Sequence, residues 1–312
     1  MNLLPIKQKE FYGLNSEFLE IINLFNNKKL PNRILLSGAK GSGKATMAYH
    51  LINYIFSQKE EYKYNYKDNI INEDNRSYKL INNGSHPNFH LIDLIDDKKN
   101  IEISQIRRMI NYTNKSSFND NPRIILIDNL ENLNLYSSNA LLKILEEPNE
   151  NIFFILILDN NKKTLQTIKS RCLNFKINLN FEQNIMITNK LINDNILDLL
   201  NKDLVSYYST VGDYLNLLDF SKKNNIDLKQ NNLNSLLKIL INENHYKKNA
   251  FINFYIFHYI ELYFLKMVSH SNYKDKTYLF YSNFIKKIDN TKRFSLDFET
   301  LFMEFKSKIL NG

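Results

Sequence analysis

Near the amino terminus, the residue types and their spacing are those of a phosphate-binding loop. Between an apolar stretch at 33–37 and a helical pattern at 43–56 lies the run Gly38-Ala39-Lys40-Gly41-Ser42-Gly43-Lys44. In such a loop the glycines let backbone N–H groups turn inward, the following helix directs its positive end at the phosphates, and the lysine adds a point charge. The candidate nucleotide-binding residues are therefore Gly38, Gly41, Ser42, Gly43, Lys44, Ala45 and Thr46, together with Asp128 at the end of a later apolar run.

Two features of this candidate site argue against hydrolysis. Ala45 stands where a Ser or Thr hydroxyl normally holds Mg²⁺, and Thr46, one residue later, is rotated by about 100° around the helix. Asp128 matches the acid that meets Mg²⁺ in such sites, or else caps its strand. Asn129 follows it, and an amide has no proton affinity near neutral pH with which to polarise water. We therefore expect that the chain by itself has no ATPase activity and requires no cofactor. Whether it binds ATP or ADP stays open.

Composition bounds the class of protein. With 312 residues, 43% of them hydrophobic and 24% charged, the chain suits two or three globular domains and is not disordered as a whole. Its net charge of +8 favours a polyanionic partner such as DNA, although a lysine-rich solvated surface would give the same value. Cys172 is the single cysteine, which excludes an internal disulfide and a multi-cysteine zinc site within one chain and fits a reducing cytoplasm.

Membrane and secretion signals are not expected either. The first ten residues include Lys7, Lys9 and Glu10 and lack a long apolar core. The apolar segment 254–268 is interrupted by Glu261 and Lys266, and it falls short of the roughly 20 residues needed to span a bilayer. We expect a cytoplasmic protein that does not contact a membrane.

Short apolar runs alternate with helical patterns in the first half of the chain, as in a parallel sheet flanked by helices. The predicted strands are 33–37, 89–94, 123–128 and 152–158, and the predicted helices between them include 43–56 and 102–113. Residues 62–83 show little periodicity and are interpreted as an insertion or long loop. After residue 180 the pattern is helical, with helices expected at 181–193, 196–208, 211–224, 232–242, 248–268, 276–288 and 296–310.

Two further motifs carry a resemblance to a known family. The run Asn139-Ala140-Leu141-Leu142-Lys143-Ile144-Leu145-Glu146-Glu147-Pro148 is followed by an apolar strand and then by Ser170-Arg171-Cys172. With these motifs the chain resembles the clamp-loader branch of the AAA+ ATPases. The Gly-Lys-Ala of its loop and Ser85-His86-Pro87 before the second strand make it most similar to the delta-prime family of bacterial DNA polymerase III subunits. The resemblance covers about residues 13–175.

This resemblance implies a three-part architecture. An α/β AAA+ P-loop domain at 1–180 would be followed by a small helical lid at 181–224 and an all-α collar, or oligomerisation, domain at 225–312. The collar would be the main assembly surface, since an aromatic-rich helix apolar on several sides needs many neighbours. Implied partners are the ATPase motor subunits and a delta-type subunit in a hetero-pentamer, the sliding clamp, and primer-template DNA. Many relatives carry a four-cysteine zinc module, but residues 57–84 contain no cysteine, so zinc is not expected.

The resemblance also assigns roles to single residues. Arg171 would act as a trans arginine finger on the ATP of a neighbouring subunit, which makes the chain a non-catalytic stator. Asp159 and Gly212 would replace the polar sensor and the second sensor arginine of active members, so both count as losses. Arg107 and Arg108 would face DNA, or else lie on an ordinary solvated helix face.

Two other classes of function stay open at this point. An active P-loop ATPase or nucleotide kinase predicts measurable turnover by the isolated chain that is sensitive to Lys44→Ala. A plain DNA-binding module, favoured by charge alone, predicts tight binding to duplex DNA without partners.

Overall fold

The computed structural model describes residues 4–95, 98–114, 121–146, 151–160, 162, 166–270, 274–294 and 296–310. Its contacts divide the chain into two compact units. The first consists of Met1–Thr188 and Thr210–Leu215, and the second of Asn189–Ser209 and Asn216–Gly312. The boundaries of the predicted lid and collar stay predictions. Among the described helices, none combines the length and the apolar character needed to cross a bilayer.

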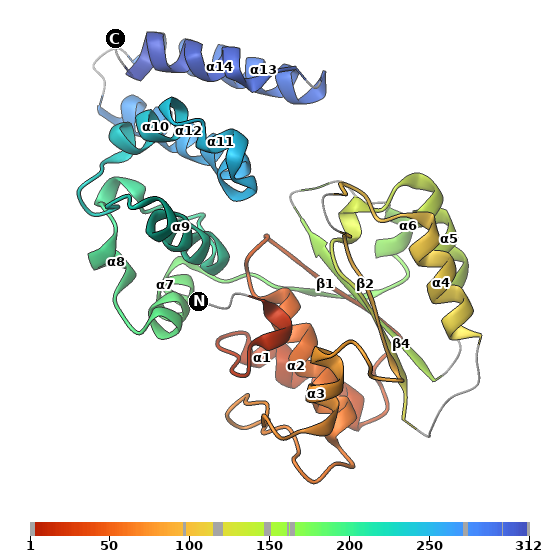
Figure 1. Ribbon diagram of the computed structural model, residues 1–312. Coiled ribbons are helices and arrows are strands. Elements are labelled where there is room, and N and C mark those ends of the chain that lie inside the picture. Colours follow the sequence, from red (N-terminus) through yellow and green to blue (C-terminus); the bar gives the residue numbers. More distant parts are fainter. Residues whose placement is uncertain are drawn as a thin grey trace. The chain divides into compact units, whose positions relative to one another are not determined.

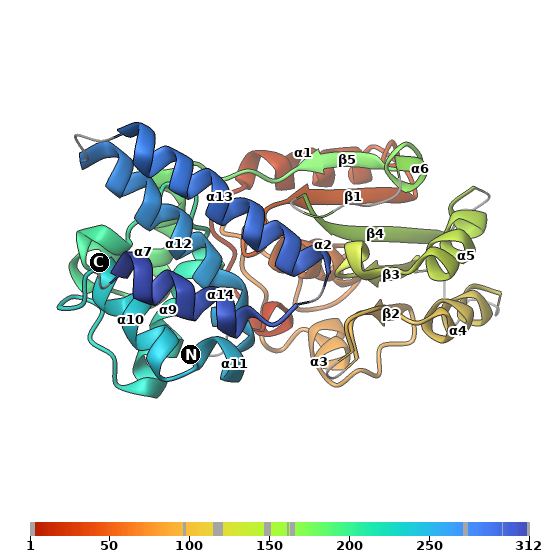
Figure 2. The same cartoon turned by 90° about the horizontal axis from the view of Figure 1, so that it is seen from above.

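The first unit is built on a five-stranded parallel sheet in the order β2-β3-β4-β1-β5 (Figures 1 and 2). Four strands match the sequence prediction: β1 (Arg33–Gly38), β2 (Phe89–Ile92), β3 (Arg123–Ile127) and β4 (Ile152–Asp159). The fifth, β5 (Leu173–Lys176), was not predicted, because Phe175 is its one buried side chain and it lacks an apolar run. The register pairs Gly38 with Asp159, so the phosphate-loop end of β1 lies beside the end of β4.

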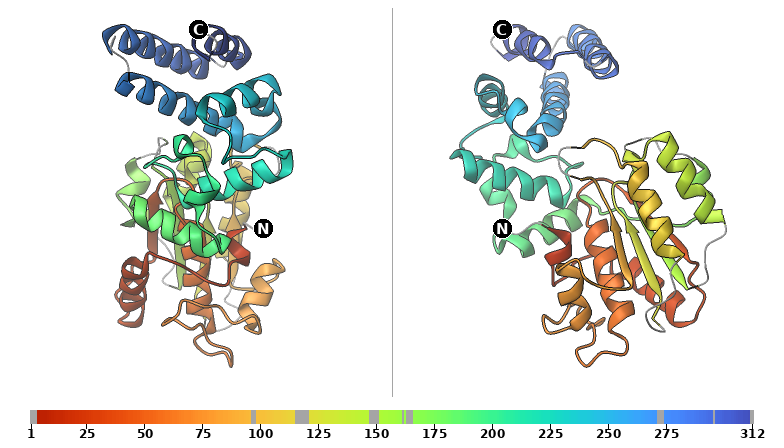
Figure 3. Two further views of the ribbon diagram at one scale, coloured as in Figure 1. Left: turned by 90° about the vertical axis from the view of Figure 1, so that its left-hand side faces the viewer. Right: turned by 45° about the vertical axis from the view of Figure 1, so that its right-hand side comes forward.

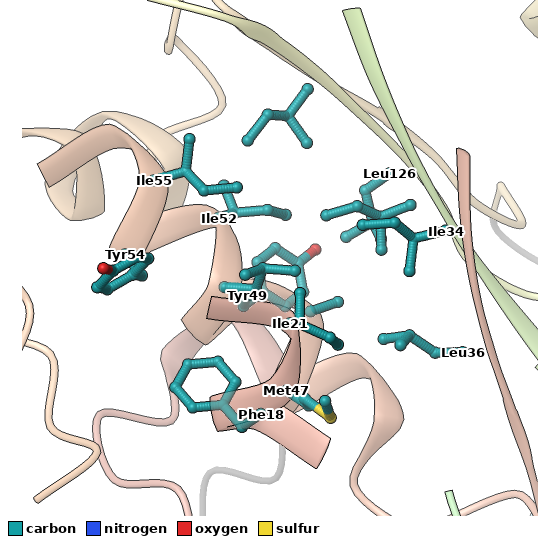
Figure 4. Close-up of a cluster of buried hydrophobic side chains, with 14 of the residues drawn as sticks. Phe18, Ile21, Ile34, Leu36, Met47, Tyr49, Ile52, Tyr54, Ile55 and Leu126 are labelled. Carbon is teal, nitrogen blue, oxygen red and sulfur yellow. The ribbon is translucent and has the colours of Figure 1, made fainter. Parts of the chain in front are cut away.

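Helices cover both faces of this sheet (Figure 3). One face carries α1 (Asn15–Asn26), α2 (Lys44–Ser57) and α3 (Arg76–Asn82), and the other carries α4 (Ile103–Thr113) and α5 (Leu135–Glu146). Successive strand residues point to opposite faces, so both faces of the central strands must be apolar. On the α2 side, Ile52 points toward Ile34 and Leu126 (Figure 4), and all three are fully buried. Each such side chain contributes about 1.5–3 kcal/mol.

The segment 62–83, interpreted from the sequence as an insertion or long loop, contains α3. This helix is short and buries only Ser77 and Ile81, too few positions to show a period. Neighbouring parts of the same segment are fixed by buried polar contacts. Because His50 Nε2 faces the carbonyl of Gln8 at 3.2 Å, this nitrogen donates, and Nδ1 accepts from the hydroxyl of Tyr64 at 2.8 Å.

The Ser-His-Pro motif has a structural role at the end of this segment. The ring of His86 stacks on Phe56 with centroids 4.2 Å apart, and its Nε2 lies 3.2 Å from the hydroxyl of Ser77. Burial lowers the pKa of His86 to about 4, so the ring is neutral at physiological pH. Aromatic stacking and a hydrogen bond therefore hold His86 in place.

The second unit is helical. It contains α8 (Ile196–Leu199), η3 (Lys202–Leu204), α10 (Leu233–Asn242), α11 (His245–Lys248), α12 (Ala250–His270), α13 (Lys274–Arg293), α14 (Phe298–Phe305) and η4 (Lys306–Leu310). Two helices lie at the division of the chain: α7 (Phe181–Ile192) and α9 (Val211–Asn224). The single helix predicted at 196–208 is wrong. The side chains of Asn195 and Asn201 each accept from a backbone N–H two residues on and start separate short turns.

Aromatic side chains of α12 fill the core of this second unit. Tyr259 and Phe264 are at most 1% exposed, and Phe264 lies near Phe284 and Phe305 at ring-centroid distances of 5.7 and 5.8 Å. Phe254 of the same helix is 59% exposed. Much of the aromatic surface that the sequence assigned to neighbouring subunits is therefore covered within the chain itself.

Candidate functional site

The phosphate loop connects β1, which ends at Gly38, to α2, which begins at Lys44. Gly41 and Gly43 have φ angles of +83° and +87°, in the left-handed region that side chains other than glycine rarely adopt. The predicted strand, loop and helix therefore follow one another as the motif requires. The side chains around the loop decide what it can bind.

Lys44 is turned back onto its own loop. Its Nζ donates to the carbonyl oxygens of Gly38 at 2.9 Å and Ala39 at 2.5 Å, and the residue is 6% exposed. Burial lowers the pKa of this ammonium group. The carboxylates of Asp159 and Asp128, and more weakly that of Glu131, act in the opposite direction and raise it. The ammonium group of Lys44 thus donates to carbonyls of its own loop, and nearby acids act on its charge.

Carboxylates gather where the strands end. Burial and the charge of Asp93 raise the pKa of Asp128 to about 6. Asn129 donates from its backbone N–H to Asp128 Oδ1 and from its side-chain amide to Asp93 Oδ1, both at 2.7 Å. Glu131 Oε2 accepts from the backbone N–H of Asp159, 3.1 Å away. These acids repel a polyphosphate, and within the described part of the chain no group of three His, Cys, Asp or Glu residues is suited to hold a metal ion.

The first turn of α9 contacts the loop from the other side. The backbone N–H of Gly212 donates to the carbonyl of Gly41 at 3.0 Å, and the hydroxyl of Thr210 donates to the carbonyl of Lys40 at 3.0 Å. Asp213 Oδ2 accepts from the backbone N–H of Thr210 at 2.9 Å and also lies 2.9 Å from the Thr210 hydroxyl, whose one proton it shares with the Lys40 carbonyl. Sequence reasoning treated Gly212 as a lost arginine and missed this contact. The available signal was a glycine in the first turn of a helix, in a chain with 7 glycines.

The residues present do not fit a nucleoside triphosphate with Mg²⁺. Ala45 offers no hydroxyl, Lys44 is bonded to loop carbonyls, and Asp128 lies in a group of acids that a triphosphate would have to approach. Ser42 Oγ is the exception in this comparison, since it is buried without a hydrogen-bond partner and a phosphate oxygen would satisfy it. One hydroxyl does not outweigh several carboxylates.

Arg171 lies apart from the loop, in the turn after α6 (Gln166–Lys169). Its Nη1 donates to the carbonyl of Thr167 at 2.9 Å, and its Nη2 pairs with Glu146 Oε1 at 2.6 Å. The side chain is 32% exposed and that of Glu146 is 52% exposed. Exposed pairs of this kind contribute about 0–1 kcal/mol, so an incoming phosphate can take over this guanidinium. Glu147 and Pro148 of the preceding motif lie outside the described residues.

Cys172, next to Arg171, has no nucleophilic character. It is partly buried, and burial raises the pKa of its thiol to about 11. A thiol that stays protonated at neutral pH is a poor nucleophile.

Arg107 and Arg108 are exposed on α4, between the buried side chains of Ile106 and Met109. Burial, together with the charge of Arg108, lowers the pKa of His90 on β2. Both guanidinium groups are available to an external anion, and their contact with DNA stays a prediction.

Comparison with known proteins places this chain in a family. Residues 15–180, more than half of the sequence, match the family described as "DNA polymerase III, delta subunit". The chain belongs to this family. This match, together with relatives named as subunit delta', confirms the delta-prime and clamp-loader assignment made from its motifs.

Relatives and a solved structure agree with this membership. The delta-family chain is 34% identical over 237 residues to a DNA polymerase III subunit gamma of Buchnera aphidicola subsp. Schizaphis graminum, a match that covers 72% of this chain and 62% of the relative. It is 31% identical over 194 residues to the subunit delta' of the same organism, which covers 61% of this chain and 57% of the relative. The chain thus spans less than two thirds of the length of these curated relatives.

The fold also matches a solved structure. A DNA polymerase III gamma subunit-related protein of Thermotoga maritima superposes with a TM-score of 0.53 at 18% identity, over 94% of this chain and 97% of that one. The predicted fold, a parallel α/β sheet flanked by helices and followed by a helical region, is confirmed.

Proposed function

We propose that this delta-family chain is a non-catalytic stator subunit of the DNA polymerase III clamp loader. The single observation that carries the proposal is the position of Lys44, whose ammonium group is bonded to the carbonyls of Gly38 and Ala39. A phosphate loop whose lysine is engaged in this way offers no cation to a triphosphate. The chain therefore neither needs ATP as a cofactor nor hydrolyses it.

In this proposal the chemistry is done in a neighbouring subunit, and Arg171 assists it. A guanidinium aimed at the charge that develops on a transferring phosphoryl group is worth roughly 10³-fold or more in rate. Arg171 suits this role because it is part-exposed in a surface turn and its pairing with Glu146 is weak. A neighbour's triphosphate, with several negative charges, competes well with one carboxylate.

The proposed partners follow from the family and from charge. Two curated relatives are named as DNA polymerase III subunits gamma and delta', which supports assembly of this chain with motor subunits and a delta-type subunit in a cytoplasmic hetero-pentamer. The net charge of +8 and the exposed Arg107 and Arg108 support contact with primer-template DNA while the sliding clamp is loaded. The helical region 225–312 would form the collar, and Phe254 is an exposed apolar side chain within it.

Reconstitution of the complex with Arg171→Ala tests the proposal. We expect assembly to be unchanged and ATP hydrolysis at the adjoining site to fall on the order of 10³-fold, with loss of clamp loading. Lys169→Ala removes the same charge two residues away and should leave both activities unchanged. Full ATPase and clamp loading with Arg171→Ala would refute the arginine finger, and brisk ATP cleavage by the purified chain alone would refute the stator.

A further inference from the structure

The phosphate loop and the first turn of α9 meet backbone to backbone. Two carbonyls of the loop, those of Lys40 and Gly41, accept hydrogen bonds at 3.0 Å from the hydroxyl of Thr210 and the N–H of Gly212. Thr210–Leu215 belong to the same compact unit as the loop, while the rest of α9 belongs to the second unit. This contact attaches a helix that continues into the second unit.

Neither side of the contact has room for a side chain. A Cβ built on Gly212 lies 2.6 Å from Gly41 Cα and 3.3 Å from the Gly41 carbonyl oxygen. A Cβ built on Gly41 lies 2.4 Å from the hydroxyl oxygen of Thr210 and 3.0 Å from Gly212 Cα. The atoms in the way at Gly212 are backbone atoms, which cannot rotate aside. Glycine is also a poor helix former, so its presence inside α9 runs against local preference and needs another reason.

We propose that the phosphate loop is the docking site for the first turn of α9. The contact through Gly41 and Gly212, called the joint below, does not depend on a bound nucleotide. The inference rests on the proposed stator function, which asks for a chain whose shape does not depend on ATP. Where the family resemblance places an arginine that reads the nucleotide, Gly212 instead bonds the loop directly. Among the glycines of the loop, Gly41 makes this backbone contact with α9, and the metal-binding hydroxyl, which such a joint does not use, is absent at Ala45.

Hydrogen exchange on the full chain tests this joint. The peptides to follow cover residues 38–46 and 210–217, with and without millimolar MgATP. In the wild type, exchange of both peptides should be the same with and without nucleotide. Gly212→Ala should increase exchange of both peptides about tenfold, because two hydrogen bonds of typical strength are lost when the backbones are forced apart.

Asn216→Ala is the matched control. Asn216 is exposed one turn further along α9, and alanine there improves helix propensity as it does at position 212. We expect Asn216→Ala to exchange like the wild type and to have a melting temperature equal to or above that of the wild type. Gly212→Ala should have a lower melting temperature than the wild type. A Gly212→Ala protein with wild-type exchange and melting would overturn the joint. So would wild-type protein whose loop gains protection with MgATP, since nucleotide would then organise it.

A second pair of variants keeps the test decisive if Gly212→Ala does not fold. Thr210→Val removes the hydroxyl that bonds Lys40, and Thr210→Ser retains it. Exchange at 38–46 should rise roughly fivefold with Val and stay unchanged with Ser, and equal exchange in the two would remove the proposal. The stator is judged separately: a complex that needs Arg171 although Gly212→Ala exchanges like wild type loses the joint alone. A complex indifferent to Arg171→Ala loses the arginine finger alone.

Discussion

Lys44 is expected to matter for stability rather than for turnover, and Lys44→Met is the variant that separates the two. Methionine keeps the length and the apolar stem of lysine and removes the charge. It removes the hydrogen bonds of Lys44 to the carbonyls of Gly38 and Ala39, which keep only backbone donors, and it removes a positive charge that acts on Asp128 and Asp159. If the loop bound ATP for hydrolysis, Lys44→Met would abolish ATPase activity. If Lys44 instead stabilises its own loop, Lys44→Met would lower the free energy of unfolding.

The size of the effect follows from the burial of the group. A hydrogen bond to a charged group contributes about 1.5–3 kcal/mol, and Lys44 makes two of them. Part of this is recovered because Asp128, whose pKa is already raised to about 6, can take up a proton and stop repelling its neighbours. We therefore expect Lys44→Met to lower the free energy of unfolding by about 2–4 kcal/mol near pH 7.5.

The pH dependence separates electrostatics from lost packing. A carboxyl whose pKa is raised in the folded protein binds a proton there before it does so in the unfolded chain, so folding gains stability as pH falls through the folded pKa. Loss of the Lys44 charge raises the folded pKa of Asp128 further. The deficit of Lys44→Met should thus shrink between pH 7.5 and pH 5. A packing defect would be the same at both pH values.

Urea unfolding of the variants, followed by circular dichroism, measures these differences. Lys40→Met, an exposed lysine of the same loop, should change stability by less than about 0.5 kcal/mol. Asp159→Asn combined with Lys44→Met should be less destabilised than the sum of the single variants, since the two charges interact. The reasoning is refuted if Lys44→Met is as stable as Lys40→Met, or if its deficit does not depend on pH.

Two further predictions concern other parts of the first unit. Burial lowers the pKa of His50 to about 4, so the unfolded chain binds a proton below pH 6.5 that the folded chain refuses, and stability is lost as pH falls from 6.5 toward 4. His50→Gln, which can still bond Gln8 and Tyr64, should reduce the stability lost between pH 7.5 and pH 5 by about 2 kcal/mol in urea titrations, and equal losses in the two proteins would contradict it. In the reconstituted complex, Arg107→Ala and Arg108→Ala should each weaken binding of duplex DNA equally for all sequences. Each should also reduce the slope of log K against log salt concentration by about one. Unchanged slopes would show that neither residue contacts DNA.

The sequence was sufficient for the central sheet because burial on both faces leaves a strong signal. Strands β1, β3 and β4 are continuous apolar runs, and α2, which was predicted as a helix at 43–56, buries Met47 and Ile52. Elements with little burial left no such signal. Strand β5 buries one residue, and α3 is only seven residues long. The local sequence pattern could therefore not distinguish either element from a loop.

The site shows a different limit. Motif spacing identified the phosphate loop, Arg171 and the missing hydroxyl at Ala45, because these are statements about residue type at a position. The contact of Gly212 with Gly41 joins residues 171 positions apart through backbone atoms, for which no side-chain pattern exists. The orientation of Lys44 toward its own loop was equally invisible, since the same lysine in the same motif can face outward to a phosphate.

What distinguishes the two candidate cations of this chain is therefore their surroundings rather than their presence. Lys44 is buried, bonded to two carbonyls and opposed by several carboxylates, so transferring it to a triphosphate would break strong interactions that water cannot replace. Arg171 faces one carboxylate and is about a third exposed, so solvent compensates when its partner Glu146 is exchanged for a phosphate. In a chain with this distribution of charge, the guanidinium group of Arg171 can bind an external phosphate more readily than the ammonium group of Lys44 can. That asymmetry, more than the loss of any one catalytic residue, is the reason for proposing a stator rather than a motor.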